Sequence, residues 1–211
     1  MDKVTPDLFK ANRDRAAPLL ARLKAEGIGH FIDGKTVPSI SGKTFETQSP
    51  VDGAVLAQVG RGSAEDIDRA ATAAALAFRA WRDMPATMRK KLLHRVADAI
   101  EDRADDIAVL ECIDTGQAHR FMAKAAVRAA ENFRFFADKC ADARDGLNMP
   151  AEEHWNVSTR VPIGPVGVIT PWNTPFSSRP GRSPRRLRPA APWCTSRPNG
   201  RRSPPICWRN W

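Results

Sequence analysis

The spacing of hydrophobic residues predicts a helix and then several short strands in the first 60 residues. Leucines recur near one face over residues 7–26, which is typical of a helix on the protein surface. Polar and apolar residues alternate at 30–34, 44–48 and 54–59, as they do in half-buried strands. Asp-Gly pairs follow or separate these runs and favour tight hairpin turns. This part of the chain is therefore predicted to form a surface helix and a small antiparallel element.

Three long helices are predicted to follow. Ser63 is a favourable N-cap residue for the first of them. Glu65 and Asp66 follow in the first turn, where the helix dipole favours negative charge. The apolar face of this helix is predicted to consist of Ile67, Ala70, Ala74, Phe78 and Trp81.

The second and third helices carry the larger apolar faces. The second begins near residue 86, bends near residues 103–106 and ends at the glycine cap Gly116. Its first half is predicted to turn inward Met88, Leu92, Val96 and Ile100. The third spans about 118–142 and is predicted to bury Met122, Ala125, Ala129, Phe133, Phe136 and Cys140.

The pattern changes again around residues 164–176. A strand is expected over 155–161, followed by a proline-rich turn and the β-branched run 166–169, so that 155–168 would form a hairpin. The run 166–169 suits a buried strand of a parallel sheet. Pro171 ends it, and the amide of Asn173 follows at its carboxyl end, which is the edge where open α/β sheets bind ligands. The predicted fold class is α/β.

Composition changes this picture only in the last 35 residues. The net charge is +9, yet residues 177–211 hold nine of the 33 basic residues and none of the 24 acidic ones, so the rest of the chain is neutral. This tail also contains seven prolines, which together with the arginines predict neither helix nor strand but a disordered segment. The chain has no apolar run long enough to span a membrane and no signal-peptide pattern at its start. Four cysteines without a Cys-x-x-Cys pair suggest free thiols in the cytoplasm.

Several motifs in order resemble the N-terminal part of the NAD(P)-dependent aldehyde dehydrogenase superfamily, over roughly residues 28–176. The matching segments are Phe31 to Gly34, Ser49 to Leu56, Ala77 to Trp81, Glu111 to Gly116, Asn132 to Ala137 and Pro165 to Phe176. The region from Asn132 to Cys140 and the run into Asn156 look most like dehydrogenases for semialdehydes from aromatic-ring cleavage, such as the carboxymethyl-hydroxymuconate semialdehyde enzyme.

The resemblance implies a site and a mechanism. A cysteine thiolate attacks the aldehyde, hydride leaves to NAD or NADP, and a water activated by a glutamate hydrolyses the thioester. Asn173 matches the family asparagine that donates to the developing oxyanion, a role that suits a neutral amide. From the residues alone, a turn asparagine after a strand is an equal alternative. Ile169, Thr170, Pro171 and Trp172 match the family's cofactor-lining backbone, and no metal site is expected.

The resemblance also divides the chain. Residues 1–27 are a helical extension, and 28–163 begin an NAD-binding, Rossmann-like domain that includes part of the oligomerisation hairpin. Residues 164–176 carry the first sheet strand and the Pro-Trp-Asn motif. The expected partners are a small aldehyde and further copies of the same chain, with no membrane and with nucleic acid only as a less favoured alternative.

Residues 177–211 do not continue the family pattern, and the genetic code suggests why. When the last base of each codon is joined to the first two bases of the next, Trp193-Cys194 must encode valine, and Cys207-Trp208 must encode leucine. A permitted translation in that frame continues Trp-Lys-Ile-Ala-Pro and later gives a Lys-Pro-x-Glu segment, as the family does. We therefore expect a frameshift at or just after Phe176. The expected chain is truncated, inactive and without the catalytic cysteine, so Cys112, Cys140, Cys194 and Cys207 are not candidates. The strand at 166–169 would then have no parallel neighbour, and the fragment would be partly folded.

Two other functions remain open from the sequence. The chain could be a non-catalytic fragment that docks on full-length subunits through an exposed edge of the 155–168 hairpin. Alternatively, the arginine-rich tail with Trp193, Trp208 and Trp211 could bind nucleic acid through phosphate contacts and base stacking.

Overall fold

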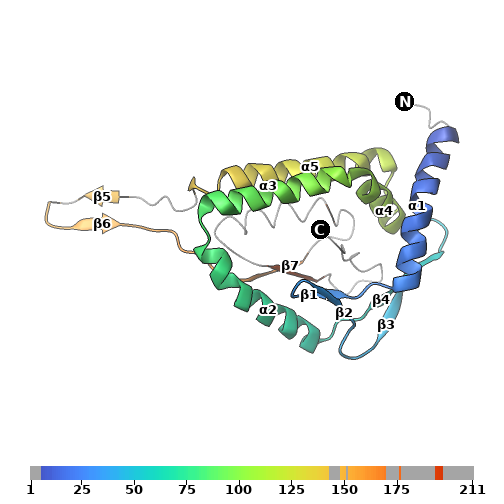
Figure 1. Ribbon diagram of the computed structural model, residues 1–211, viewed down its shortest axis with the longest axis horizontal. Coiled ribbons are helices and arrows are strands. Elements are labelled where there is room, and N and C mark those ends of the chain that lie inside the picture. Colours follow the sequence, from blue (N-terminus) through green and yellow to red (C-terminus); the bar gives the residue numbers. More distant parts are fainter. Residues whose placement is uncertain (1–5, 143–147, 151, 170–175, 177–192, 197–211) are drawn as a thin grey trace.

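Five helices and eight strands make up the part of the chain that the structure describes (Figure 1). This computed structural model describes residues 6–142, 148–150, 152–169, 176 and 193–196. In chain order the elements are α1 (Pro6–Glu26), β1 (His30–Ile32), β2 (Lys35–Val37), β3 (Thr44–Gln48), β4 (Val55–Gly60), α2 (Ala64–Asp83), α3 (Ala86–Asp102), α4 (Ala104–Thr115), α5 (His119–Asp138), β5 (Asn148–Pro150), β6 (Trp155–Val157), β7 (Val166–Ile169) and β8 (Trp193–Ser196).

The N-terminal region forms as the sequence predicts. The helix α1 packs against α4 and β4, and its half-buried leucines face that contact. The strands β1 and β2 form an antiparallel hairpin around the Asp33-Gly34 turn, and β3 pairs antiparallel with β4. In β3 only Phe45 and Thr47 turn inward, which is the predicted alternation.

A capping box starts α2 and ties it to the first hairpin. The backbone N–H of Asp66 donates to the Ser63 hydroxyl, and the Ser63 backbone N–H donates to the Asp66 carboxylate, which confirms the predicted cap. The buried Asp66 carboxylate also accepts bonds from the Ser39 hydroxyl and the Ile40 backbone N–H. One carboxylate thus joins the helix to a loop 26 residues earlier. The predicted face of α2 is wrong at Ile67, which is 46% exposed.

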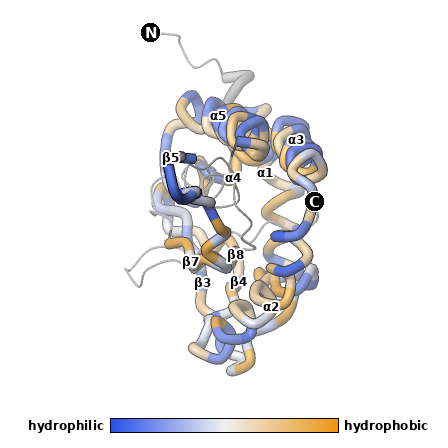
Figure 2. The backbone as a smooth tube through the Cα atoms, turned by 90° about the vertical axis from the view of Figure 1, so that its left-hand side faces the viewer, coloured by the Kyte–Doolittle hydropathy of each residue, from blue (hydrophilic) through white to orange (hydrophobic). Residues whose placement is uncertain are grey.

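The helices α3, α4 and α5 form the main hydrophobic core. In Figures 1 and 2, α3 and α5 run side by side, and α4 connects them at one end. Four alanines of α5 are completely buried, and such small side chains allow close helix packing. The six residues predicted to be buried along the third helix are all buried, although α5 ends at Asp138 and Cys140 lies just after it.

The predicted inward face of α3 is off by about one residue. Met88 and Val96 are exposed, whereas Leu93 and Ala97 are buried, and only Ile100 agrees fully with the prediction. Both rows are apolar, so periodicity alone does not choose between them. The contact with the small residues of α5 selects the row that packs closely.

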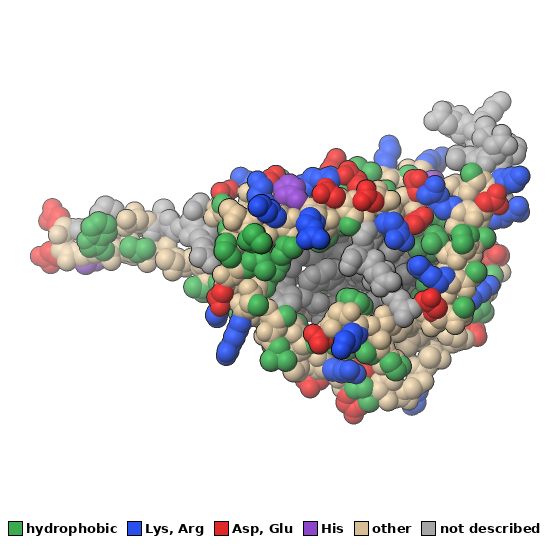
Figure 3. Space-filling view, in the orientation of Figure 1, with side chains coloured by type: hydrophobic (Ala, Val, Ile, Leu, Met, Phe, Trp, Pro, Cys, Tyr) green, Lys and Arg blue, Asp and Glu red, His purple; other side chains and the backbone are tan. Residues whose placement is uncertain are grey.

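The hairpin after α5 differs from the predicted one. Trp155–Val157 pairs with the upstream strand Asn148–Pro150, and residues 158–165 form no strand. All three residues of β6 are exposed, and Trp155 is 79% exposed. Figure 1 shows this hairpin projecting from the body of the molecule, and Figure 3 shows hydrophobic side chains along it. Periodicity did not predict β5, because the strand has only three residues and one of them is Pro150, a residue type that is confined to edge strands.

The strand β7 has a parallel partner, which the sequence analysis did not expect. The strand β8 pairs with it in register, from Val166 opposite Trp193 to Ile169 opposite Ser196. The 23 residues between Ile169 and Trp193 suffice for a parallel crossover. Residues 193–196 contain neither proline nor arginine, and Trp and Thr favour strands. The predicted disorder of the rest of the tail concerns residues outside those described.

Candidate functional site

The first sequence-predicted site residue, Ile169, lies at the carboxyl end of β7. Gly164 opens the turn into this strand with φ of +108°, a conformation that favours glycine. Side chains then alternate, with Val168 buried and Ile169 56% exposed. Because β7 and β8 are parallel, Ile169 marks the edge of the pair where ligands bind in open α/β sheets.

Phe176, seven residues after the end of β7, is fixed by contacts with the helical core. The Phe176 side chain is 8% exposed and belongs to the core formed by α3, α4 and α5. Its backbone N–H donates to Oε1 of Glu111, at 2.6 Å, and Glu111 lies on α4. The helical layer and the sheet are therefore joined on either side of residues 170–175.

The other sequence-predicted site residues are Thr170, Pro171, Trp172 and Asn173. All four lie outside the described residues, so their cofactor-lining and oxyanion roles stay predictions.

Sequence reasoning missed the role of Glu111. The sequence motif from Glu111 to Gly116 includes this residue but predicts no contact for its side chain. A signal was present, because Glu111 stands four residues after Ile107 and three before Asp114, at the spacing of a buried helix face. A carboxylate at such a position needs hydrogen-bond donors, and it obtains one from the Phe176 backbone.

The two described cysteines outside the strands lack the environment of a nucleophile. Burial raises the pKa of the Cys112 thiol, despite a backbone hydrogen bond involving His119 that lowers it. A catalytic thiol has its pKa lowered instead. Cys140 is buried, and its Sγ lies 3.6 Å from the Phe136 carbonyl oxygen, to which it donates. That neither cysteine is catalytic stays a prediction.

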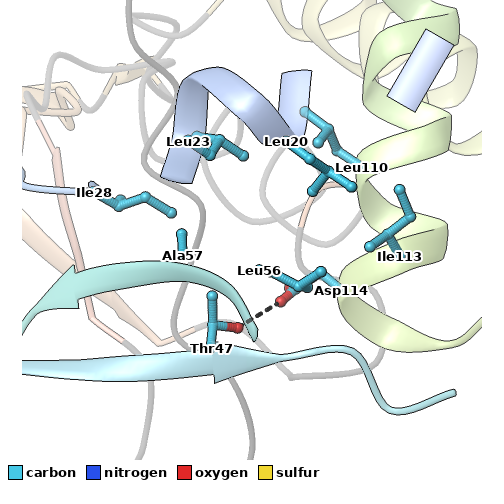
Figure 4. A pocket seen from close by; sticks show the side chains of 9 residues that line it. All are labelled: Leu20, Leu23, Ile28, Thr47, Leu56, Ala57, Leu110, Ile113 and Asp114. Atoms are coloured by element: carbon cyan, nitrogen blue, oxygen red, sulfur yellow. Dashed lines mark hydrogen bonds between the residues drawn. The ribbon is translucent and has the colours of Figure 1, made fainter. Parts of the chain in front are cut away.

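A small hollow lies elsewhere, between α1, the β3–β4 pair and α4 (Figure 4). Its walls are mostly aliphatic, and the Thr47 hydroxyl donates to Asp114 Oδ1 at 3.4 Å on one side. None of the residues that line it belongs to β7 or to the sequence-predicted site. We attribute it to imperfect packing between these elements.

The described part of the chain contains neither a metal-ion cluster nor a membrane-spanning helix. Within the described residues, no three His, Cys, Asp or Glu side chains gather as they would around a metal ion. Among the described helices, none combines the length and the apolar character that crossing a bilayer requires.

Comparison with known families identifies the family of this chain. The model of the aldehyde dehydrogenase family matches residues 37–180, more than half of the chain. The chain therefore belongs to the aldehyde dehydrogenase family, and its described part has the α/β fold of that family's N-terminal portion.

Two relatives illustrate the sequence similarity. The mitochondrial benzaldehyde dehydrogenase of Antirrhinum majus is 42% identical over 150 residues, which cover 69% of this chain and 28% of the relative. The 2-hydroxymuconic semialdehyde dehydrogenase of Pseudomonas sp. strain CF600 is 38% identical over 155 residues, which cover 71% of this chain and 32% of the relative.

Solved structures agree with this assignment. HpcC from Thermus thermophilus superposes with a TM-score of 0.84 at 38% identity, covering 87% of this chain and 36% of that one. The NAD+ complex of an aldehyde dehydrogenase from Bacillus cereus gives 0.77 at 33% identity, covering 81% and 35%. The chain thus spans about a third of the length of the proteins it matches.

Proposed function

We propose that these 211 residues come from an NAD(P)-dependent aldehyde dehydrogenase that oxidises an aldehyde to the carboxylic acid through a cysteine thiohemiacetal. Family membership over residues 37–180 is the observation that carries the proposal. The placement of Ile169 at the carboxyl end of the parallel pair supports it, because that edge is the expected binding edge.

A nicotinamide dinucleotide is the ligand that we propose for this edge. Ile169 ends the strand, and its exposed side chain is accessible to a ligand. The bound cofactor would accept the hydride of the aldehyde, and Ile169, Thr170, Pro171 and Trp172 would line it. A family member from Bacillus cereus is known as an NAD+ complex, which supports the same cofactor class here.

Asn173 is proposed to stabilise the oxyanion that forms when a thiolate attacks the carbonyl. A side-chain amide donates a hydrogen bond without competing as an acid, and one such donor contributes about 10²–10³-fold to the rate. The substrate class is proposed to be a semialdehyde derived from an aromatic ring. The similarity to 2-hydroxymuconic semialdehyde dehydrogenase supports this choice, and the 42% identity to a benzaldehyde dehydrogenase makes a simple aromatic aldehyde the alternative substrate.

The nucleophile and the general base are proposed to lie outside these 211 residues. The raised pKa of Cys112 and the burial of Cys140 argue against both as nucleophiles. We infer that the frame shifts at or just after Phe176, so the 211-residue chain is inactive by itself.

The test is an activity assay of the frame-restored protein. We expect aldehyde-dependent formation of NADH or NADPH, and none from the 211-residue chain. Asn173→Ala should lower kcat about 10²–10³-fold. Gln48→Ala, an exposed amide residue on strand β3, is the matched control and should keep full activity. An active Asn173→Ala enzyme would refute the oxyanion role, and an inactive restored enzyme would refute the proposed function.

The projecting hairpin favours a second candidate, a non-catalytic fragment that docks on full-length subunits. Trp155 and Met149 are exposed at 79% and 62%, which is unusual for large apolar side chains at no interface. The docking edge is therefore β5–β6 and not the predicted 155–168 hairpin. Co-purification with the restored enzyme should occur and be lost in Trp155→Lys. Failure of the unchanged chain to co-purify would exclude this candidate.

A further inference from the structure

We propose that Glu111 is a positioning residue that fixes the backbone of Phe176, and with it the downstream end of the segment that carries Asn173. Its importance for catalysis rests on the proposed function. The contact itself does not, because it is defined by two described residues.

The contact is specific because the Glu111 carboxylate is buried. Its exposed fraction is 4%, and glutamate is seldom buried to that extent without hydrogen-bond donors. The Phe176 N–H is one such donor, at 2.6 Å from Oε1 and 65 positions later in the chain. A bond from a backbone N–H to an ionised carboxylate is about twice as strong as a neutral one.

Phe176 is held in a second way by its side chain. The ring is buried in the same core as Ile107 on α4 and Phe133 on α5. The helix α4 therefore contributes Ile107 to the core that buries the ring and Glu111 to the hydrogen bond with the Phe176 backbone. Burial of the ring stabilises Phe176 in the core, whereas the hydrogen bond to the carboxylate fixes the position of its backbone N–H.

The upstream end of the same segment is fixed by the sheet. Val168 is buried, and β7 pairs with β8 up to Ile169. Asn173 follows Ile169 by four residues and precedes Phe176 by three. A misplacement of about 1 Å costs about 10²-fold in rate when a donor must meet a reacting atom. Loss of one anchor should therefore reduce turnover.

Amide hydrogen exchange of the 211-residue chain tests the contact without any activity. In Glu111→Ala, exchange at Phe176 should accelerate at least tenfold, while amides in the middle of α5 change less than threefold. Glu111→Gln retains a neutral carbonyl acceptor, so Phe176 should accelerate about threefold. Glu131→Ala, on the exposed side of α5, is the control and should leave Phe176 unchanged.

Each outcome decides for or against the contact. An unprotected Phe176 amide in the unchanged chain would overturn the proposal, as would unchanged Phe176 exchange in Glu111→Ala. If Glu111→Ala loses amide protection throughout the chain, the exchange rate of Phe176 in Glu111→Gln tests the contact instead. A selective acceleration at Phe176 supports the contact, and a rate equal to that of the unchanged chain overturns it.

Kinetics of the frame-restored enzyme then test the positioning role. Glu111→Ala should lower kcat at least tenfold with both KM values within twofold, because binding surfaces are retained and only the donor is displaced. Glu111→Gln should fall between Glu111→Ala and the unchanged enzyme, and Glu131→Ala should match the latter. Unchanged kcat in a folded Glu111→Ala enzyme would overturn the role. Absence of aldehyde oxidation by the unchanged enzyme would instead refute the proposed function, while the exchange result would still judge the contact.

Discussion

Asp66 shows how one side chain organises the N-terminal half of the chain. Burial by itself would raise the pKa of Asp66, but hydrogen bonds from the backbone N–H groups of Ser63 and Ile40 and from the Ser39 and Ser63 hydroxyls outweigh it. The pKa is held well below its usual range. The carboxylate is therefore ionised at neutral pH and serves as the acceptor that α2 and the loop share.

Asp66→Asn should destabilise the protein by about 2–4 kcal/mol, because buried donors would meet an amide N–H group or lose their acceptor. Asp68→Asn, two residues later on the exposed side of α2, should change stability by less than about 0.5 kcal/mol. Urea unfolding at pH 7 measures both. Equal stability of Asp66→Asn and the unchanged chain would contradict the assigned network.

The same residue predicts a pH dependence. The pKa of Asp66 is lower in the folded state than in the unfolded state, where aspartate has a pKa of about 3.9. The stabilisation is therefore complete above that value and is lost as the pH falls toward the lower folded pKa. The stability difference between the unchanged chain and Asp66→Asn should still be present at pH 5 and shrink below about pH 4. A difference that grew on acidification would contradict the sign.

At the scale of elements, the end of α4 depends on a glycine. Gly116 caps the helix with φ of +73°, and a Cβ there would meet Cγ of Pro50 at 3.0 Å. Gly53 has the same φ but open space around it. Gly53→Ala should therefore cost about 1 kcal/mol from backbone conformation alone, and Gly116→Ala about 2–3 kcal/mol. Thermal unfolding compares the two, and a larger loss in Gly53→Ala would contradict the packing argument.

The helices also show what the sequence could and could not predict. The face of α5 was predicted correctly because its buried residues are separated by more polar ones. On α3, the row through Met88 and Val96 and the row through Leu93 and Ala97 are both apolar, so only the packing partner distinguishes them. Exposed ion pairs such as Arg134 with Asp98 then add little, because solvent screens them.

The strands and the site were harder to predict for a related reason. Pairing joins residues through backbone bonds, which sequence periodicity does not encode, so β5 and β8 were missed. The strand β7 was predicted correctly from β-branched residues followed by proline, and the ligand-binding role of its carboxyl end stays a prediction. The contact of Glu111 with Phe176 joins residues 65 positions apart and was visible only as a carboxylate on an apolar face.

At the scale of the whole molecule, the helical core and the remainder should differ in stability. The core of α3, α4 and α5 is continuous, whereas Trp155, Val161, Ile163 and Ile169 are all more than half exposed. Such exposure suits surfaces that further chain or further subunits cover. The 211-residue chain is therefore expected to fold only partly.

Unfolding of the isolated chain tests this expectation. Heating should give a broad loss of helical circular dichroism, and the protein should bind a hydrophobic dye before the transition. A single sharp transition, seen at the same temperature by near-ultraviolet and far-ultraviolet circular dichroism, would show a complete cooperative fold and contradict it.

The central claim is that residues up to Phe176 belong to an aldehyde dehydrogenase whose frame is lost immediately afterwards. Sequencing the DNA across the codons of Phe176 and Ser177 tests it most directly. We predict that adding or removing bases there opens a frame that begins Trp-Lys-Ile-Ala-Pro and continues through a Lys-Pro-x-Glu segment. A DNA sequence in which neither other frame encodes that continuation would contradict the claim, and residues 177–211 would then have to be regarded as the protein's own.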